Sequence, residues 1–138
     1  MRKIHVVTAC SETIQGYDKG EVSEEGIDMS GVSDNECSFI LASDIIDEIP
    51  TDNIGAAMQI FVSKMRMGST LITGGTDIRL LSRAVVRGDI PVADASRLMS
   101  VSNSCVDLRT IVGILKSLGL TIKSTAYQGV RYEIEATR

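Results

Sequence analysis

The chain has 138 residues and a net charge of −4, with an isoelectric point near 4.9. This length fits one domain that buries roughly two-thirds of its unfolded surface. Its 14 lysines and arginines are dispersed along the sequence, so we expect no nucleic-acid partner. Its three cysteines lack metal-ligand spacing, which indicates free thiols in a reducing compartment.

No segment stays apolar for the roughly 20 residues that a membrane-spanning helix needs. The N-terminal residues Met1-Arg2-Lys3 lead into an apolar run that is too short for a signal peptide. We therefore expect a soluble protein of the cytoplasm with no membrane partner.

In chain order, the first predicted strand covers residues 3–9, which are mostly β-branched or apolar. Residues 17–22 and 26–29 predict two shorter, more polar strands near a sheet edge. A turn-rich connection, residues 30–36, follows them. The N-terminal quarter therefore contributes strands and loops rather than helices.

Residues 37–42 form an almost uninterrupted apolar run, which is typical of a central strand buried on both faces. Thr51-Asp52-Asn53 supplies N-cap chemistry for a helix that Gly68 is expected to end. One face of that helix is apolar, through Ala57, Ile60, Phe61 and Met65. With a second apolar run at residues 70–73, the order strand, helix, strand predicts a right-handed parallel βαβ unit.

Further along, residues 77–88 and 106–118 have helical periodicity, and residues 92–101 suit a short helix or a loop. Residues 120–126 and 130–136 alternate as the two strands of a hairpin. The whole predicts an α/β fold with a mostly parallel sheet of up to seven strands that ends in an antiparallel hairpin. We expect helices on both faces of this sheet and ligands at the carboxyl ends of its strands.

Several segments together resemble one family. Residues 38–50 are similar to its fourth strand and the following "hvlEHi" segment, although Ser38 replaces the usual Asp and Glu48 the usual His. Residues 61–72 are similar to the "LkpGG" turn and the fifth strand, and residues 115–122 with 132–138 to the "LleeaGF" helix end and the last strand. By their order and spacing, these segments resemble the class I S-adenosylmethionine-dependent methyltransferases. The resemblance implies a single Rossmann-like domain over residues 1–138, with S-adenosylmethionine as cofactor.

The most similar members are compact forms that occur in phage genomes and glycan gene clusters, with a "GCG" turn after the first strand and then "pGyxxvD". Here the turn reads Thr8-Ala9-Cys10, and only Gly16-Tyr17 of the second motif is kept. The family's glycines let the backbone approach the methionine part of the cofactor, whereas Thr8 and Cys10 place side chains there. The glycine motif is therefore degenerate, and the cofactor is either bound weakly or lost.

The resemblance assigns Glu21 to the ribose hydroxyls and Asp28 to the adenine amine. The full implied cofactor set is Thr8, Ala9, Cys10, Gly16, Glu21, Asp28, Ser43 and Asp44. The alternative is that Glu21 and Asp28 are solvated acids at strand ends, and that Asp44, Asp47 and Glu48 belong to a polar loop.

Other candidate chemistry is weaker. His5 lies inside a strand, and Cys10 has no second histidine to activate it. Gly74-Gly75 is not followed by the Gly-Lys-Ser/Thr of a phosphate loop. We therefore expect no metal, no catalytic cysteine and no nucleoside triphosphate.

Two functions remain open. One is a small S-adenosylmethionine-dependent methyltransferase that acts on an unidentified small molecule or protein. The other is a non-catalytic binding or assembly module, such as a viral structural or accessory protein in the host cytoplasm or the virion. Glu21 and Asp28 favour the first, and the Thr8-Ala9-Cys10 turn favours the second. The chain lacks the N-terminal cap helices and inserted lid of many such enzymes, so we expect it to self-associate or to recruit an assembly partner.

Overall fold

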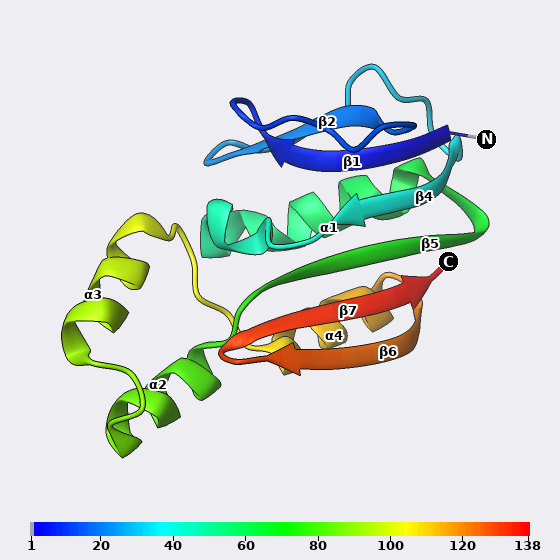
Figure 1. Ribbon diagram of the computed structural model, residues 1–138. Helices are drawn as coiled ribbons and strands as arrows, with labels where there is room; N and C mark the ends of the chain where they lie inside the picture. Colours follow the sequence, from blue (N-terminus) through cyan, green and yellow to red (C-terminus); the bar gives the residue numbers. More distant parts are fainter. Residues whose placement is uncertain (1) are drawn as a thin grey trace.

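A computed structural model describes residues 2–138 and contains one seven-stranded sheet in the order β3-β2-β1-β4-β5-β7-β6 (Figure 1). β1, β2, β4 and β5 pair in parallel, whereas β3 and β7 run antiparallel to their neighbours. The strands are β1 (Arg2–Thr8), β2 (Asp18–Ser23), β3 (Gly26–Asp28), β4 (Cys37–Ala42), β5 (Met65–Thr76), β6 (Thr121–Gln128) and β7 (Arg131–Thr137). The central position of residues 37–42 and the closing hairpin are confirmed.

Two helices, α1 (Ile54–Lys64) and α4 (Leu108–Ser117), cover one face of the sheet. Their apolar residues fall three or four apart, so each presents one face to the strands. Ile111 and Leu115 of α4 are completely buried, as is Phe61 of α1. They pack with the inward side chains of the strands into one core. The helix predictions for these two segments are confirmed, and their buried faces pack on the apolar side chains that the strands contribute to the core.

The opposite face, which we call the open face, carries none of the helices of residues 2–138 (Figure 1). The structure here differs from the predicted helices on both faces. β1 and β2 are joined by residues 9–17, which form a loop, because a helical crossover between parallel strands normally needs a dozen or more residues. β2 and β3 are joined by a tight turn. Neither connection can supply a covering helix.

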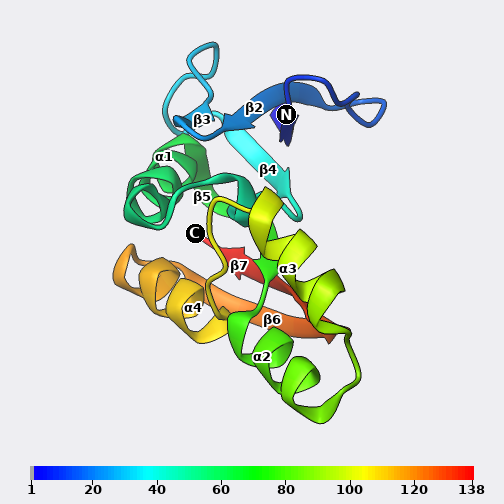
Figure 2. The same cartoon turned by 90° about the vertical axis from the view of Figure 1, so that its left-hand side faces the viewer.

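Two further helices, α2 (Ile78–Arg87) and α3 (Val92–Val101), lie beyond the carboxyl ends of the parallel strands (Figure 2). Residues 92–101 are therefore a helix rather than a loop. The helix predicted at residues 77–88 is confirmed as α2, and the structure pairs it with α3. No helix of the described residues is long and apolar enough to cross a membrane. The short 3-10 turns η1 (Ile46–Glu48) and η2 (Thr51–Asn53) lead from β4 into α1.

The boundary between α1 and β5 corrects one prediction. α1 ends at Lys64 instead of Gly68, and β5 is much longer than the predicted strand at residues 70–73. Gly68 has a φ of +81° within β5, and its N–H donates to the carbonyl oxygen of Arg138. Pairing with a segment distant in the sequence therefore extends the strand through a glycine that locally suits a helix end.

Candidate functional site

The candidate site lies at the carboxyl edge of the sheet, where β1, β2, β4 and β5 end. β1 ends at Thr8 and β4 at Ala42, and these two strands are neighbours in the sheet. The first residue of β7, Arg131, pairs with Thr76 at the end of β5. Because β7 runs antiparallel, its amino end comes to the same edge, where the carboxyl ends of parallel strands collect polar side chains.

The turn after β1 is closed by its own side chains. The Ser11 N–H donates to the Thr8 carbonyl oxygen at 3.0 Å, and the two hydroxyls of these residues are 2.8 Å apart. The Lys19 ammonium donates to the carbonyl oxygen of Ala9 at 2.9 Å. Cys10 is an exposed free thiol, and none of residues 8–10 has a positive φ. The turn therefore forms without glycine and carries a side chain at each of its positions.

Glu21 lies on β2, opposite Val7 of β1 and Asp28 of β3. Its side chain is 48% exposed, and its one ion pair within residues 2–138 joins Oε1 to Nζ of Lys19 at 3.5 Å. An ion pair of this length and exposure is weak, so the carboxylate is available to a ligand. Glu21 and Asp28 also line one shallow hollow of about 290 Å³ with Arg2 and Lys19.

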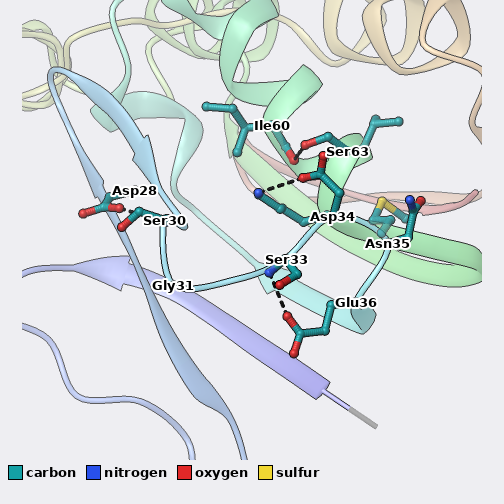
Figure 3. A network of polar contacts seen from close by, with 12 residues as sticks. Asp28, Ser30, Gly31, Ser33, Asp34, Asn35, Glu36, Ile60 and Ser63 are labelled. Atoms are coloured by element: carbon teal, nitrogen blue, oxygen red, sulfur yellow. Dashed lines mark hydrogen bonds and ion pairs between the residues drawn. The ribbon is translucent and has the colours of Figure 1, made fainter.

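Asp28 has a local structural role at the end of β3 (Figure 3). Its carboxylate accepts the N–H of Ser30 at 3.0 Å, and this bond holds the pKa of Asp28 below its usual value of 3.8. Two more contacts hold the segment between β3 and β4. The Ser33 N–H donates to the Glu36 carboxylate at 2.7 Å, and the Lys64 ammonium donates to the Asp34 carboxylate at 2.8 Å. The carboxylate of Asp28 is thus already used in a turn, although the group remains exposed.

Asp44, just after β4, is one of two non-glycine residues among residues 2–138 with a positive φ, which is 58°. Such strained backbone is concentrated at functional sites, where the surrounding structure enforces it. The side chain of Asp44 is paired with Arg131, whose guanidinium Nε and Nη2 lie 2.9 and 2.8 Å from Oδ1 of Asp44. Neighbouring Ser43 lies 3.4 Å from Glu133 through its hydroxyl. The β4 end is thereby tied to β7.

These residues border a cavity of about 340 Å³ on the carboxyl edge. Its lining mixes polar and apolar surface and is formed by Asp44, Ala126, Tyr127, Gln128, Arg131, Tyr132 and Glu133. Arg131 and Glu133 had not been identified from the sequence. The one available signal was the charge alternation Arg131, Glu133, Glu135 on the predicted last strand, which places all three on one side of it.

Asp47 is buried, which corrects its interpretation as part of a polar loop. Its carboxylate accepts the N–H and the hydroxyl of Thr76, at 2.9 and 2.6 Å, and so fixes η1 against the end of β5. Burial, reinforced by the negative charge of Asp47, raises the pKa of the Tyr132 phenol far above its ordinary value of 10. This hydroxyl has no hydrogen-bond partner within the described chain. Asp47 therefore supports the edge structurally, and Tyr132 stays protonated.

The remaining predicted residues lie apart from this cavity. Gly16, with a φ of +88°, turns the loop that brings Tyr17 over the open face. The Nδ1 atom of His5 accepts the N–H of Ile14 at 3.2 Å, which agrees with a satisfied strand histidine. No group of three metal-ligating side chains was found in residues 2–138. The structure thus brings Ser43 and Asp44 together with Arg131, and Glu21 together with Asp28, as two separate clusters.

Comparison with known proteins gives structural likeness only. No protein-family model matches the chain, and no curated protein matches it by sequence. A solved S-adenosylmethionine-dependent methyltransferase from Archaeoglobus fulgidus superposes with a TM-score of 0.65 at 11% identity, over 99% of this chain and 86% of that protein. A methyltransferase from Thermotoga maritima, described as a possible histamine N-methyltransferase, superposes with a TM-score of 0.64 at 13% identity, over 99% of this chain and 81% of that protein.

An O-methyltransferase family protein from Burkholderia thailandensis is also similar, with a TM-score of 0.63 at 12% identity, over 88% of this chain and 36% of that protein. These identities establish the fold and leave activity open. The strand order, the antiparallel β7 and the near-complete superpositions agree with one another. The chain therefore has the seven-stranded, Rossmann-like fold of the S-adenosylmethionine-dependent methyltransferases.

Proposed function

We propose that this protein binds S-adenosylmethionine at the carboxyl ends of β1 and β2 and acts as a methyltransferase. The observation that carries the proposal is the position of Glu21, an accessible carboxylate on β2 beside the end of β1, in a chain with this fold. A carboxylate can accept hydrogen bonds from two neighbouring ribose hydroxyls. Its pairing with Lys19 is loose enough for such a ligand to compete.

The residues fit the cofactor well at Glu21 and less well at the turn after β1. Thr8 and Cys10 have β-carbons where bare backbone would allow close approach, and the Thr8–Ser11 contact holds the turn closed. The cofactor supplies an activated methyl group. The chain's contribution is to hold it near an acceptor, since proximity and orientation account for much of the acceleration in such reactions.

In this proposal the acceptor binds in the 340 Å³ cavity beside Asp44. Asp44 and Glu133 offer two carboxylates that accept hydrogen bonds, so an acceptor with N–H or O–H groups would be oriented there. Arg131 is paired with the carboxylate of Asp44 and is a positioning residue in this proposal. The residues that line the cavity come from β6, β7 and the end of β4.

Isothermal titration calorimetry with S-adenosylmethionine tests the cofactor site. We expect Glu21→Ala to weaken binding by about ten- to a hundredfold, the loss of roughly 1.5–3 kcal/mol for a charge-assisted pair of hydrogen bonds. Glu24→Ala, in the turn between β2 and β3, is the matched control and should bind like the wild type. Tight binding that Glu21→Ala leaves unchanged would contradict the assigned ribose position.

A second candidate is a non-catalytic binding or assembly module. The closed turn at Thr8–Ser11 specifically favours it, because this turn opposes cofactor approach. Replacing both Thr8 and Cys10 by glycine should improve S-adenosylmethionine binding, despite a cost in backbone entropy of about 1 kcal/mol per glycine. If the folded double variant shows no binding at all, the assembly module becomes the better account.

A further inference from the structure

The open face of the sheet carries a continuous row of side chains from β1 to β7. Because side chains alternate along a strand, Ile4 and Val6 point into the core, and Lys3 and His5 point to the open face. The strand pairing aligns His5 with Leu41, Leu41 with Ile72, and Ile72 with Glu135. These four residues therefore lie side by side in one row across the strands β1, β4, β5 and β7.

The middle of this face is apolar. Phe39 and Leu41 of β4 and Ile72 of β5 are only partly buried, and Tyr17 lies edge-on to Phe39 with ring centroids 6.2 Å apart. We call these four residues the apolar strip. Parallel strands almost always have both faces covered, because both faces carry apolar side chains. In residues 2–138 only the loop at residues 9–17 lies over this face, so the strip lacks most of its cover.

Opposite charges flank the apolar strip. On the β1 side, Lys3 is exposed, and its ammonium lies 5.8 Å from the centre of the Tyr17 ring with no carboxylate partner in the described chain. On the β7 side, Glu133 and Glu135 each lie 3.4 Å from a serine hydroxyl, and neither forms an ion pair with any residue from 2 to 138. Within residues 2–138, the β1 border therefore carries the unpaired positive charge of Lys3, and the β7 border carries two unpaired carboxylates beside Arg131, which is paired with Asp44.

We propose that the open face is the interface of a homodimer. A twofold axis parallel to the strands, above the boundary between β4 and β5, places β1 of one copy opposite β7 of the other. That operation lays the two apolar strips against each other. It also brings Lys3 of each copy to the β7 border of its partner, at the level of Thr137 and two residues along the strand from Glu135, a separation that the long lysine side chain can span. Two sheets pack in this manner about 10 Å apart.

The second copy is the occupant that the charges favour. An unrelated partner would need its own negative and positive borders in matching positions, whereas a copy of this chain has them by symmetry. The inference is independent of cofactor binding, since the open face is formed by the middle of the strands. A dimer through the open face would account for the self-association expected from the sequence.

Sedimentation equilibrium of the full chain tests the dimer by charge reversal. We expect the wild type to be mostly dimeric at about 50 µM. Lys3→Glu and Glu135→Lys should each weaken the dimer about tenfold, and the double variant should recover to within about threefold of the wild type. A monomeric wild type at this concentration, or a double variant weaker than both single variants, would overturn the proposal.

A second pair of variants separates the open face from the other exposed apolar surface, on α2 and α3. Ile72→Thr removes apolar area from the strip, and Val86→Thr makes the same kind of change at a site that is 87% exposed on α2. We expect Ile72→Thr to weaken the dimer at least about fivefold and Val86→Thr to leave it unchanged. The reverse pattern would place the interface on the helix pair and overturn the proposal.

Discussion

Among the glycines of the described chain, Gly74 of β5 leaves the least room for a β-carbon, and we expect Gly74→Ala to be strongly destabilising. A β-carbon at this position would lie 2.2 Å from the carbonyl oxygen of Tyr132 and 3.2 Å from its carbonyl carbon. Ordinary contacts of this kind are no shorter than about 3.0–3.4 Å, so β5 and β7 would have to separate by roughly 1 Å. The obstacle is backbone, which cannot rotate away as a side chain can.

The expected loss follows from two terms. Overpacking of this kind costs about 1–3 kcal/mol, and weakening two ladder hydrogen bonds adds about 1 kcal/mol each. Alanine also lowers the conformational entropy of the unfolded chain, which offsets about 0.4–1 kcal/mol of this loss of stability. The net loss is about 3 kcal/mol, which lowers the urea midpoint by roughly 2 M for a domain of this size.

Gly113→Ala is the matched control for Gly74→Ala. Gly113 lies on the exposed side of α4, with no atom of the described chain within 4 Å of an added β-carbon. We expect this change to raise stability by about 0.5–1 kcal/mol, because alanine favours helix. Equal urea midpoints for Gly74→Ala and the wild type would refute the close approach of β5 and β7.

Three further changes probe the core and the helix caps. Ile111→Asp should cost roughly 3–5 kcal/mol, since it buries an unpaired charge under the sheet; an unchanged urea midpoint would contradict that burial. Tyr132→Phe should stabilise the fold by about 1 kcal/mol because it removes a buried hydroxyl without a partner, and a lower thermal midpoint would show that the hydroxyl is bonded. Asp107, the N-cap of α4, accepts hydrogen bonds from the Thr110 hydroxyl and from Arg79, and these bonds hold the pKa of its carboxyl below 3.8. The ionised carboxylate therefore stabilises the fold above pH 3.8, and this stabilisation is lost as the pH falls further. Asp107→Asn should therefore lose less stability than the wild type between about pH 5 and pH 3 in urea titrations.

Elements set by local patterns were predictable from the sequence. The buried strand β4, the apolar face of α4 and the hairpin of β6 and β7 each depend on the spacing of neighbouring residues. The end of α1 was misplaced because Gly68 suits a helix end locally, whereas its actual role depends on pairing with Arg138. The length of the connection at residues 9–17 was a usable signal for the open face, since it leaves little room for a crossover helix.

The candidate site was only partly predictable for the same reason. Ser43 and Asp44 follow a buried strand and were identified from the sequence, but the partner of Asp44 is 87 residues away at Arg131. That contact requires β7 to lie next to β5, which no local pattern specifies. The positive φ of Asp44 suits aspartate, which adopts the left-handed region more often than most residues, but no local pattern requires it there.

The place of β7 in the sheet constrains the order in which the molecule can fold. β7 follows β6 in the chain but lies between β5 and β6, so β6 has no strand neighbour until β7 is present. During synthesis, the edge of β5 must therefore stay unpaired while more than fifty residues are added, at about 5–20 residues per second. An unpaired strand edge is a template for association with other chains. Docking of the β6–β7 hairpin as one unit closes that edge, which makes this late step the point at which nascent chains are most exposed to aggregation.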